Sequence, residues 1–151
     1  MDAIDRAILR ELQQDGRLTN AELADRVRLT PSPCLRRVRQ LERSGVIRGY
    51  RALLDGDSVS RGFQAFVTVT LAREDRGTVA EFEGRIQECT EVVEAHRIFG
   101  ETDFLLRVAV RDLPAYEKFN TRVLLALPGV ARVTSHLMMK TVKEDRGLPV
   151  R

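Results

Sequence analysis

Residues 19–43 read TNAELADRVRLTPSPCLRRVRQLER, and this stretch decides the fold of the N-terminal third. Thr19 and Glu22 have the S/T-x-x-E spacing of a capping box, which begins a short helix. Pro31 and Pro33 then fall in the first turn of a longer helix, where proline costs little because the first N–H groups have no acceptor inside the helix. The stretch therefore predicts a short helix, a tight break and a second helix that ends near Ser44.

One further helix is expected before this stretch. Apolar residues recur at helical spacing between residues 2 and 14, at Ile4, Ile8, Leu9 and Leu12. Asp15-Gly16 then supplies a stop signal. Three small helices could also form a generic bundle. The function of this unit therefore has to be inferred from the outer surface of the last helix.

The last helix has two different faces. At about 100° per residue, one side is apolar and predicts a core face made of Cys34, Leu35, Val38 and Leu41. The opposite side carries Arg36, Gln40 and Arg43, with Arg37 and Arg39 on the flanks. A short helix, a tight turn and a second helix with such a polar face are typical of a helix-turn-helix that binds a DNA major groove. Cys34 is expected to be a core thiol rather than a nucleophile.

The distribution of charge supports this interpretation. The chain has 25 basic and 22 acidic residues, and the whole excess lies in residues 1–50, which carry ten arginines and seven acids. From Arg26 to Arg48 there are seven arginines and a single acid, Glu42. Such a patch can neutralise DNA phosphates, although a solvated helix face would explain the charge alone.

Composition limits the remaining classes of protein. The 151 residues are 43% hydrophobic, enough for one compact domain or two small ones. No apolar run approaches the roughly 18 residues of a membrane span, and residues 1–5 do not resemble an export signal, so we expect a cytoplasmic protein without a membrane partner. The spacing of Cys34, Cys89, His96 and His136 does not suggest a metal site.

The rest of the chain changes to an α+β pattern. Residues 45–54 predict a connecting strand, and a strand-helix-strand pattern then occurs twice. Strands are expected at residues 63–71, 92–99, 104–110 and 130–139, with helices between residues 77 and 89 and from residue 112 to 127. Two such units predict a ferredoxin-like βαββαβ sandwich with both helices on one sheet face and the other face free for a partner.

Three motifs are similar to those of one known family: residues 29–50 (LTPSPCLRRVRQLERSGVIRGY), residues 100–103 (GETD) and residues 127–130 (LPGV). On these motifs the chain resembles the Lrp/AsnC (feast/famine) transcriptional regulators over residues 5–144, and most closely the leucine-responsive branch. The resemblance implies a winged helix-turn-helix domain at residues 1–49, a linker strand at 50–62 and a ferredoxin-like effector-binding and oligomerisation domain at 63–151. It also implies a bacterial or archaeal source, homodimers that assemble into octamers or similar rings, and effector pockets at contacts between dimers.

The helix-turn-helix supplies the candidate residues for binding double-stranded DNA. Arg36, Arg37 and Gln40 are expected to enter the groove, because arginine can bind guanine and glutamine can bind adenine through two hydrogen bonds. Arg39 and Arg43 suit phosphate contacts or surface ion pairs, and Thr19 is also fully explained as a helix cap. The expected DNA-binding set is Thr19, Asn20, Arg28, Ser32, Pro33, Arg36, Arg37, Arg39 and Gln40.

The second domain supplies a candidate site for a small amino-acid effector, and no other cofactor is expected. Such a ligand needs an acceptor for its ammonium and donors for its carboxylate, which the loop of Gly100, Glu101, Thr102 and Asp103 can provide. If the last strand packs beside the loop, Ser135, His136 and Met138 become its side walls. Leu105, Leu137 and Met138 favour leucine or methionine as the effector.

Two other classes of protein compete with a regulator of amino-acid metabolism genes. Asp103 and His136 could form the acid/base pair of an enzyme, but the sequence has neither a nucleophile elbow nor a phosphate-binding glycine loop. The chain could also be a ligand-binding module with an incidental basic head, and the loop could be only a hairpin turn. We expect a DNA-binding transcriptional regulator and not an enzyme.

Overall fold

The computed structural model describes residues 1–145 and 147–150 and divides the chain into two units. The first unit holds Met1–Leu53 and the last described residues from Val142 onward, and the second holds Leu54–Thr141. The described residues from Val142 onward therefore group with the first unit by their contacts, and the expected bounds of the second domain, 63–151, stay a prediction. Val150 packs against the core of the first unit, and its carbonyl accepts a hydrogen bond of 3.5 Å from Arg10. Among the described helices, none combines the length and apolarity needed to cross a membrane.

The first unit consists of the three expected helices, α1 (Ala3–Gln14), α2 (Asn20–Arg26) and α3 (Pro31–Arg43). The predicted capping box of α2 is confirmed, because the Glu22 N–H donates to the Thr19 hydroxyl and the Thr19 N–H donates to the Glu22 carboxylate. The core of the unit consists of residues from all three helices: Ile8, Leu9, Leu23, Ala24, Cys34 and Leu41. Burial raises the pKa of the Cys34 thiol, as expected for a core thiol.

The apolar face of α3 is narrower than the sequence predicted. Cys34 and Leu41 are buried and Val38 is half-buried, but Leu35 is 37% exposed. Among the described residues, α1, α2 and a few flanking side chains such as Ile47 and Val150 pack against this core, and they leave the Leu35 edge of the apolar stripe open to solvent.

Residues 45–54 do not form the predicted strand. A strand needs a neighbour to receive its backbone hydrogen bonds, and this segment pairs with no strand in the described chain. Its apolar side chains remain exposed, with Leu53 at 81% and Leu54 at 71%. The link between the two units is therefore an extended segment in the single chain.

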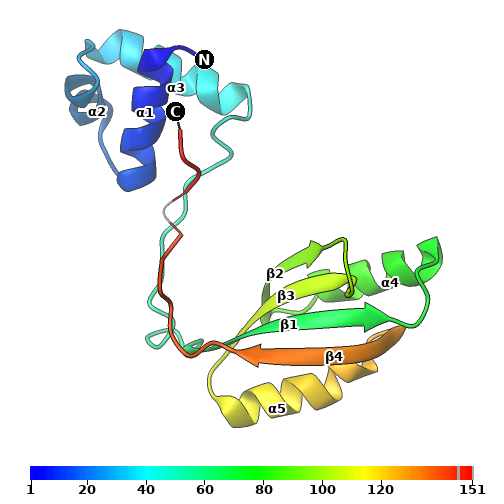
Figure 1. Cartoon of the computed structure of the whole chain (residues 1–151). Coiled ribbons are helices and arrows are strands. Elements are labelled where there is room, and N and C mark those ends of the chain that lie inside the picture. Colours follow the sequence, from blue (N-terminus) through cyan, green and yellow to red (C-terminus); the bar gives the residue numbers. More distant parts are fainter. Residues whose placement is uncertain (146, 151) are drawn as a thin grey trace. The chain divides into compact units, whose positions relative to one another are not determined.

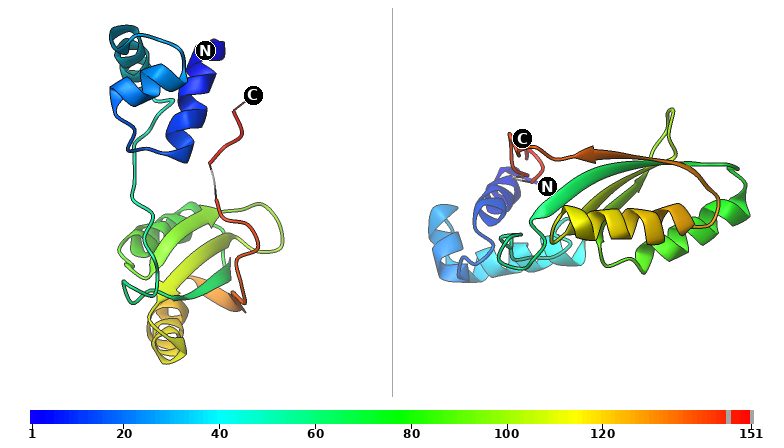
Figure 2. Two further views of the ribbon diagram at one scale, coloured as in Figure 1. Left: turned by 90° about the vertical axis from the view of Figure 1, so that its left-hand side faces the viewer. Right: turned by 90° about the horizontal axis from the view of Figure 1, so that it is seen from below.

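The second unit is a ferredoxin-like sandwich, as predicted (Figure 1). Its elements follow in the order β1 (Phe63–Leu71), α4 (Arg76–Gln87), β2 (Val92–Arg97), β3 (Phe104–Val110), α5 (Leu113–Arg122), a short 3-10 helix (Leu124–Ala126) and β4 (Val130–Leu137). The antiparallel sheet has the order β2-β3-β1-β4. Both helices cover the same face of the sheet, which two further views also show (Figure 2).

The core of this unit lies between the sheet and the two helices. Ala65, Val67 and Val69 alternate along β1 and are fully buried. The rings of Phe82 on α4 and Phe104 on β3 pack with their centroids 4.5 Å apart. Asp75 and Asp112 cap the two helices by accepting backbone N–H groups, and these hydrogen bonds lower the pKa of both carboxyls.

Within the described second unit, no helix covers the other sheet face. The strand register places Phe66 beside Arg107 and His136 on this face, and Thr68 beside Leu105 and Thr134. Phe66 is 38% exposed, and Thr68 and Leu105 are only half-buried. This open sheet face, with Phe66, Thr68 and Leu105 at its centre, is the free surface that the sequence predicted.

Candidate DNA-binding surface and effector loop

The turn between α2 and α3 is held by local hydrogen bonds. The Leu29 N–H donates to the Ala24 carbonyl at 2.8 Å, and the side-chain amide of Asn20 donates to the Pro31 carbonyl at 2.8 Å. Arg28 has a φ of 56°, a left-handed conformation that reverses the chain within the turn. The bond from Asn20 holds the start of α3 against α2, so the orientation of α3 is set by the turn itself.

The outer face of α3 carries a row of long polar side chains, which we name the α3 polar face: Arg36, Arg39, Gln40 and Arg43. All four are exposed. None of these side chains forms a hydrogen bond or ion pair within residues 1–145 and 147–150. Ser32, exposed, and Pro33, half-buried, stand at the N-terminal end of the same helix. This face can therefore donate its full set of hydrogen bonds to a partner.

Arg37 lies in a different environment from the other arginines of α3. Its guanidinium binds the carboxylates of Asp2 at 2.8 Å and Asp5 at 2.7 Å, at the N-terminus of α1. The hydrogen bond to Asp5, followed by the one to Asp2, raises the pKa of Arg37. Asp2 also caps α1, and the N–H of Asp5 is the main cause of its lowered pKa. The pairing ties α3 to α1, a role that helical periodicity alone did not suggest.

The Gly100–Asp103 loop closes the hairpin between β2 and β3, and Asp103 fixes its base. One Asp103 carboxylate oxygen, Oδ2, accepts the Leu71 N–H at 2.7 Å, and the Asp103 N–H donates to the Val69 carbonyl at 3.0 Å. Glu101 is exposed and Thr102 is half-buried. Gly100, also exposed, has a φ of 155°, at the limit of the region that favours glycine. In a single chain Asp103 thus anchors the loop to the end of β1 with one oxygen, and the described residues make no hydrogen bond to its Oδ1.

The expected side walls do not lie beside this loop within one chain. β1 separates β4 from β3, and β4 runs away from the loop toward Gln64, whose carbonyl accepts the Met138 N–H. Ser135 accepts the Tyr116 hydroxyl at 2.5 Å on the helix side of the sheet. His136 pairs in register with Phe66 on the open sheet face. One chain therefore does not bring Ser135, His136 and Met138 together with Gly100–Asp103.

A basic helix-turn-helix joined to a ferredoxin-like unit defines a class of DNA-binding regulator with a separate sensing domain. Two family models match the two parts of the chain. The model described as "Winged helix-turn-helix DNA-binding" matches residues 1–48, and the model described as "Lrp/AsnC ligand binding domain" matches residues 64–148. The chain belongs to the Lrp/AsnC family of transcriptional regulators, which sets aside the alternative of an enzyme.

Individual relatives agree over almost the whole chain. The leucine-responsive regulatory proteins of Escherichia coli (strain K12) and Salmonella typhimurium are 42% identical to it over 151 residues, all of this chain and 92% of each relative. The solved complex of a Neisseria meningitidis transcriptional regulator with L-methionine has a TM-score of 0.94 at 41% identity, covering 99% of this chain and 96% of that chain. An AsnC family transcriptional regulator from Agrobacterium tumefaciens has a TM-score of 0.92 at 39% identity, covering 99% and 97% of the two chains.

Proposed function

We propose that this regulator inserts α3 into the major groove of double-stranded DNA and that a free amino acid alters its DNA affinity or assembly. The observation that carries the proposal is the α3 polar face, whose side chains are exposed and have no partners within the described chain. Exposed arginines without internal partners retain their hydrogen bonds for phosphates and base edges.

We assign different roles to the candidate DNA-binding residues. Arg36 and Gln40 contact base edges, because their side chains can form paired hydrogen bonds to guanine and adenine. We assign contacts with the DNA phosphates or the rest of the DNA backbone to the residues around them: Thr19, Asn20, Arg28, Ser32, Pro33, Arg39 and Arg43. Arg37 positions α3, because both of its carboxylate partners belong to the α1 N-terminus.

The active species is proposed to be a homodimer joined through the open sheet face, with dimers assembling into an octamer or a similar ring. Phe66, Thr68 and Leu105 leave apolar and half-buried surface without a cover on this face. A two-fold dimer presents two helix-turn-helix units, or heads, to DNA. Its DNA sites should therefore be pseudo-palindromic, with half-sites about 34 Å or a multiple apart. Because the proposed regulator acts on genomic DNA, we propose that it works in the cytoplasm.

The proposed effector is an apolar amino acid, leucine or methionine, bound at the Gly100–Asp103 loop. The names of the enteric relatives and the L-methionine complex of the Neisseria protein support this class of ligand. The Oδ1 atom of Asp103 is the proposed acceptor for the ligand ammonium. Because one chain separates the loop from Ser135, His136 and Met138, we propose that a neighbouring copy supplies these side walls.

Gel-shift titration with a library of genomic fragments tests the proposal. We expect a subset of fragments to bind at least a hundredfold more tightly than the rest, and millimolar leucine or methionine to change the affinity or the number of shifted bands. Asp103→Asn should abolish the effector response and retain DNA binding, because an amide oxygen can still accept the Leu71 N–H. Equal affinity for all fragments would contradict the DNA-binding role, and a response that survives Asp103→Asn would contradict the loop site.

A further inference from the structure

Two adjoining cavities lie between α4 and the edge strand β2. The larger, about 420 Å³, is lined by Glu74, Arg76, Val79, Ala80, Glu83 and Arg97. The smaller, about 210 Å³, is lined mainly by Phe82, Ile86, Ala95 and Phe104. Glu83 and Arg97 border both cavities, so these two side chains stand where a charged compartment meets an apolar one.

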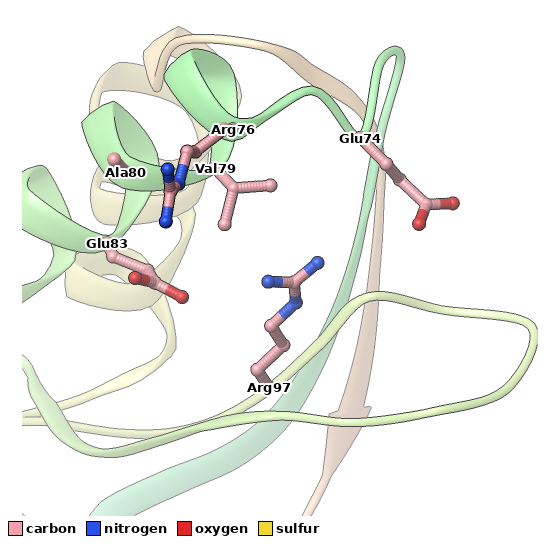
Figure 3. Close-up of a pocket in the computed structure, with 6 residues that line it drawn as sticks. All are labelled: Glu74, Arg76, Val79, Ala80, Glu83 and Arg97. Carbon is pink, nitrogen blue, oxygen red and sulfur yellow. The ribbon is translucent and has the colours of Figure 1, made fainter.

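The charged compartment contains two cations and two anions from different parts of the fold. Arg76 and Glu83 share a face of α4, since they are seven residues apart on the helix. Arg97 is the last residue of β2, and its guanidinium extends into the hollow toward these two side chains (Figure 3). Within the described chain, no hydrogen bond or ion pair involves the side chains of Arg76, Glu83, Arg97 or Glu74.

This lack of partners contrasts with the sheet residue Arg107, which binds Glu94 at 2.7 Å and Gln64 at 3.2 Å. In the hollow, opposite charges line one cavity without pairing with each other. A ligand that carries both a carboxylate and an ammonium would satisfy both signs at once, whereas a simple anion or cation would satisfy only one.

The apolar compartment suits the rest of such a ligand. Arg97 pairs in register with Phe104, which places both on the helix side of the sheet. Phe104 packs against Phe82 at 4.5 Å between centroids, and Ile86 follows one turn later on α4. Phe82, Phe104 and Ile86 are themselves almost fully buried, with exposed fractions of 0%, 3% and 5%, and they line the inner wall of the smaller cavity. An aliphatic side chain entering here would lie over them, beside Ala95.

We propose that this junction is a second ligand site, which takes a free α-amino acid with an aliphatic side chain. Arg97, with Arg76 beside it, binds the α-carboxylate through its planar guanidinium. Glu83 accepts the α-ammonium, and the side chain enters the compartment of Phe82 and Phe104. The inference goes beyond the effector loop, because none of these residues belongs to Gly100–Asp103.

The site also has a direct route to the hairpin that follows it. Arg97 is followed by Ile98, whose N–H donates to the Asp103 carbonyl at 2.9 Å and closes the base of the loop. A ligand held by Arg97 would therefore restrain the loop from its base. Occupancy of the junction should slow hydrogen exchange at Ile98.

Equilibrium dialysis of the full chain with radiolabelled L-leucine and L-methionine tests the proposal by counting ligands per chain. We expect two in the wild type, one in Arg97→Gln, one in Asp103→Asn and none in the double variant. Arg97→Lys keeps the charge but loses the planar fork, and it should weaken the junction site at least tenfold. Arg85→Gln removes an α4 arginine that lines neither cavity and pairs at 3.9 Å with Glu88, so it should still bind two.

Ligand analogues distinguish the contact made by the ligand ammonium from the contact made by its carboxylate. The leucine analogue 4-methylpentanoate lacks the ammonium and should bind the junction at least tenfold more weakly than leucine in Asp103→Asn, where only the junction remains. Glu83→Gln should remove that difference. Melting temperatures near that of the wild type would confirm that the variants are folded.

The number of ligands bound per chain by each variant distinguishes the junction site from the effector-loop site. A single ligand per chain that is lost only in Asp103→Asn would overturn the junction site and leave the loop intact. A single ligand lost only in Arg97→Gln would support the junction and contradict the loop. Binding that Arg97→Gln leaves unchanged, or no binding by the wild type at 10 mM, would overturn the junction site.

Discussion

Replacing Arg36 and Arg37 by alanine should affect different properties of the protein, although the two residues are neighbours on α3. Arg36 is exposed and its side chain has no partner in the described part of the chain, so Arg36→Ala should leave the folded state unchanged. Arg37 binds both Asp2 and Asp5, so Arg37→Ala leaves two neighbouring carboxylates without their cation. We therefore expect Arg36→Ala to weaken DNA binding and Arg37→Ala to lower the melting temperature.

The size of the Arg36 effect depends on what the side chain contacts. A base contact contributes about 1–3 kcal/mol per head, or roughly a 5- to 150-fold loss of affinity, and a dimer with two bound heads loses about twice that free energy. A contact to phosphate alone would weaken all DNA sequences equally and would make the slope of log K against log salt shallower by about 0.9 per head.

Fluorescence anisotropy with a labelled site, measured from 50 to 300 mM salt, distinguishes these cases. Arg122→Ala is the matched control, because Arg122 is an exposed arginine at the end of α5 in the other unit and its loss changes the net charge equally. The control should bind like the wild type. Unchanged affinity and salt slope in Arg36→Ala, with an unchanged melting temperature in Arg37→Ala, would refute the orientation assigned to α3.

Three further predictions follow from the second unit and the helix caps. The isolated unit Leu54–Thr141 should dimerise through the open sheet face, and Phe66→Arg should make it monomeric; light scattering that shows a monomeric wild-type unit at micromolar concentration would exclude this interface. Phe82→Ala should destabilise the second unit by about 3–5 kcal/mol in urea unfolding, because Phe82 is fully buried against Phe104; a loss below about 1 kcal/mol would contradict the packing. The caps Asp2, Asp75 and Asp112 have lowered pKa values in the fold, so their contribution to stability should be complete above about pH 5 and fall as the pH drops below about 4; a melting temperature that is constant down to pH 2 would contradict their role.

Those features that depend on neighbours in the sequence could be predicted from the sequence. The capping box of Thr19 and Glu22 and the prolines of α3 are local signals, and each helix begins where they indicate. The alternation along β1 likewise predicted its two faces. The strand expected at residues 45–54 is absent because a β pattern forms a strand only when it pairs with another strand, and this segment pairs with none of the four described strands.

Features that depend on residues distant in the sequence could not be predicted in this way. The pairing of Arg37 with Asp2 joins the two ends of the helical unit, and periodicity indicates only that Arg37 lies on a flank. Arg97 and Glu83 line the same two cavities because the fold places β2 beside α4. The proposed wall of Ser135, His136 and Met138 required β4 to lie next to the loop, whereas β1 occupies that position.

Genome-wide mapping of bound DNA, with and without added amino acids, tests the central claim most directly. Purified protein is mixed with sheared genomic DNA at physiological salt, and the retained fragments are sequenced in the absence and presence of millimolar leucine or methionine. We predict a limited set of pseudo-palindromic sites, enriched near genes of amino-acid metabolism, whose occupancy changes with the amino acid. Uniform coverage of the genome that neither amino acid alters would contradict a sequence-specific, amino-acid-responsive regulator.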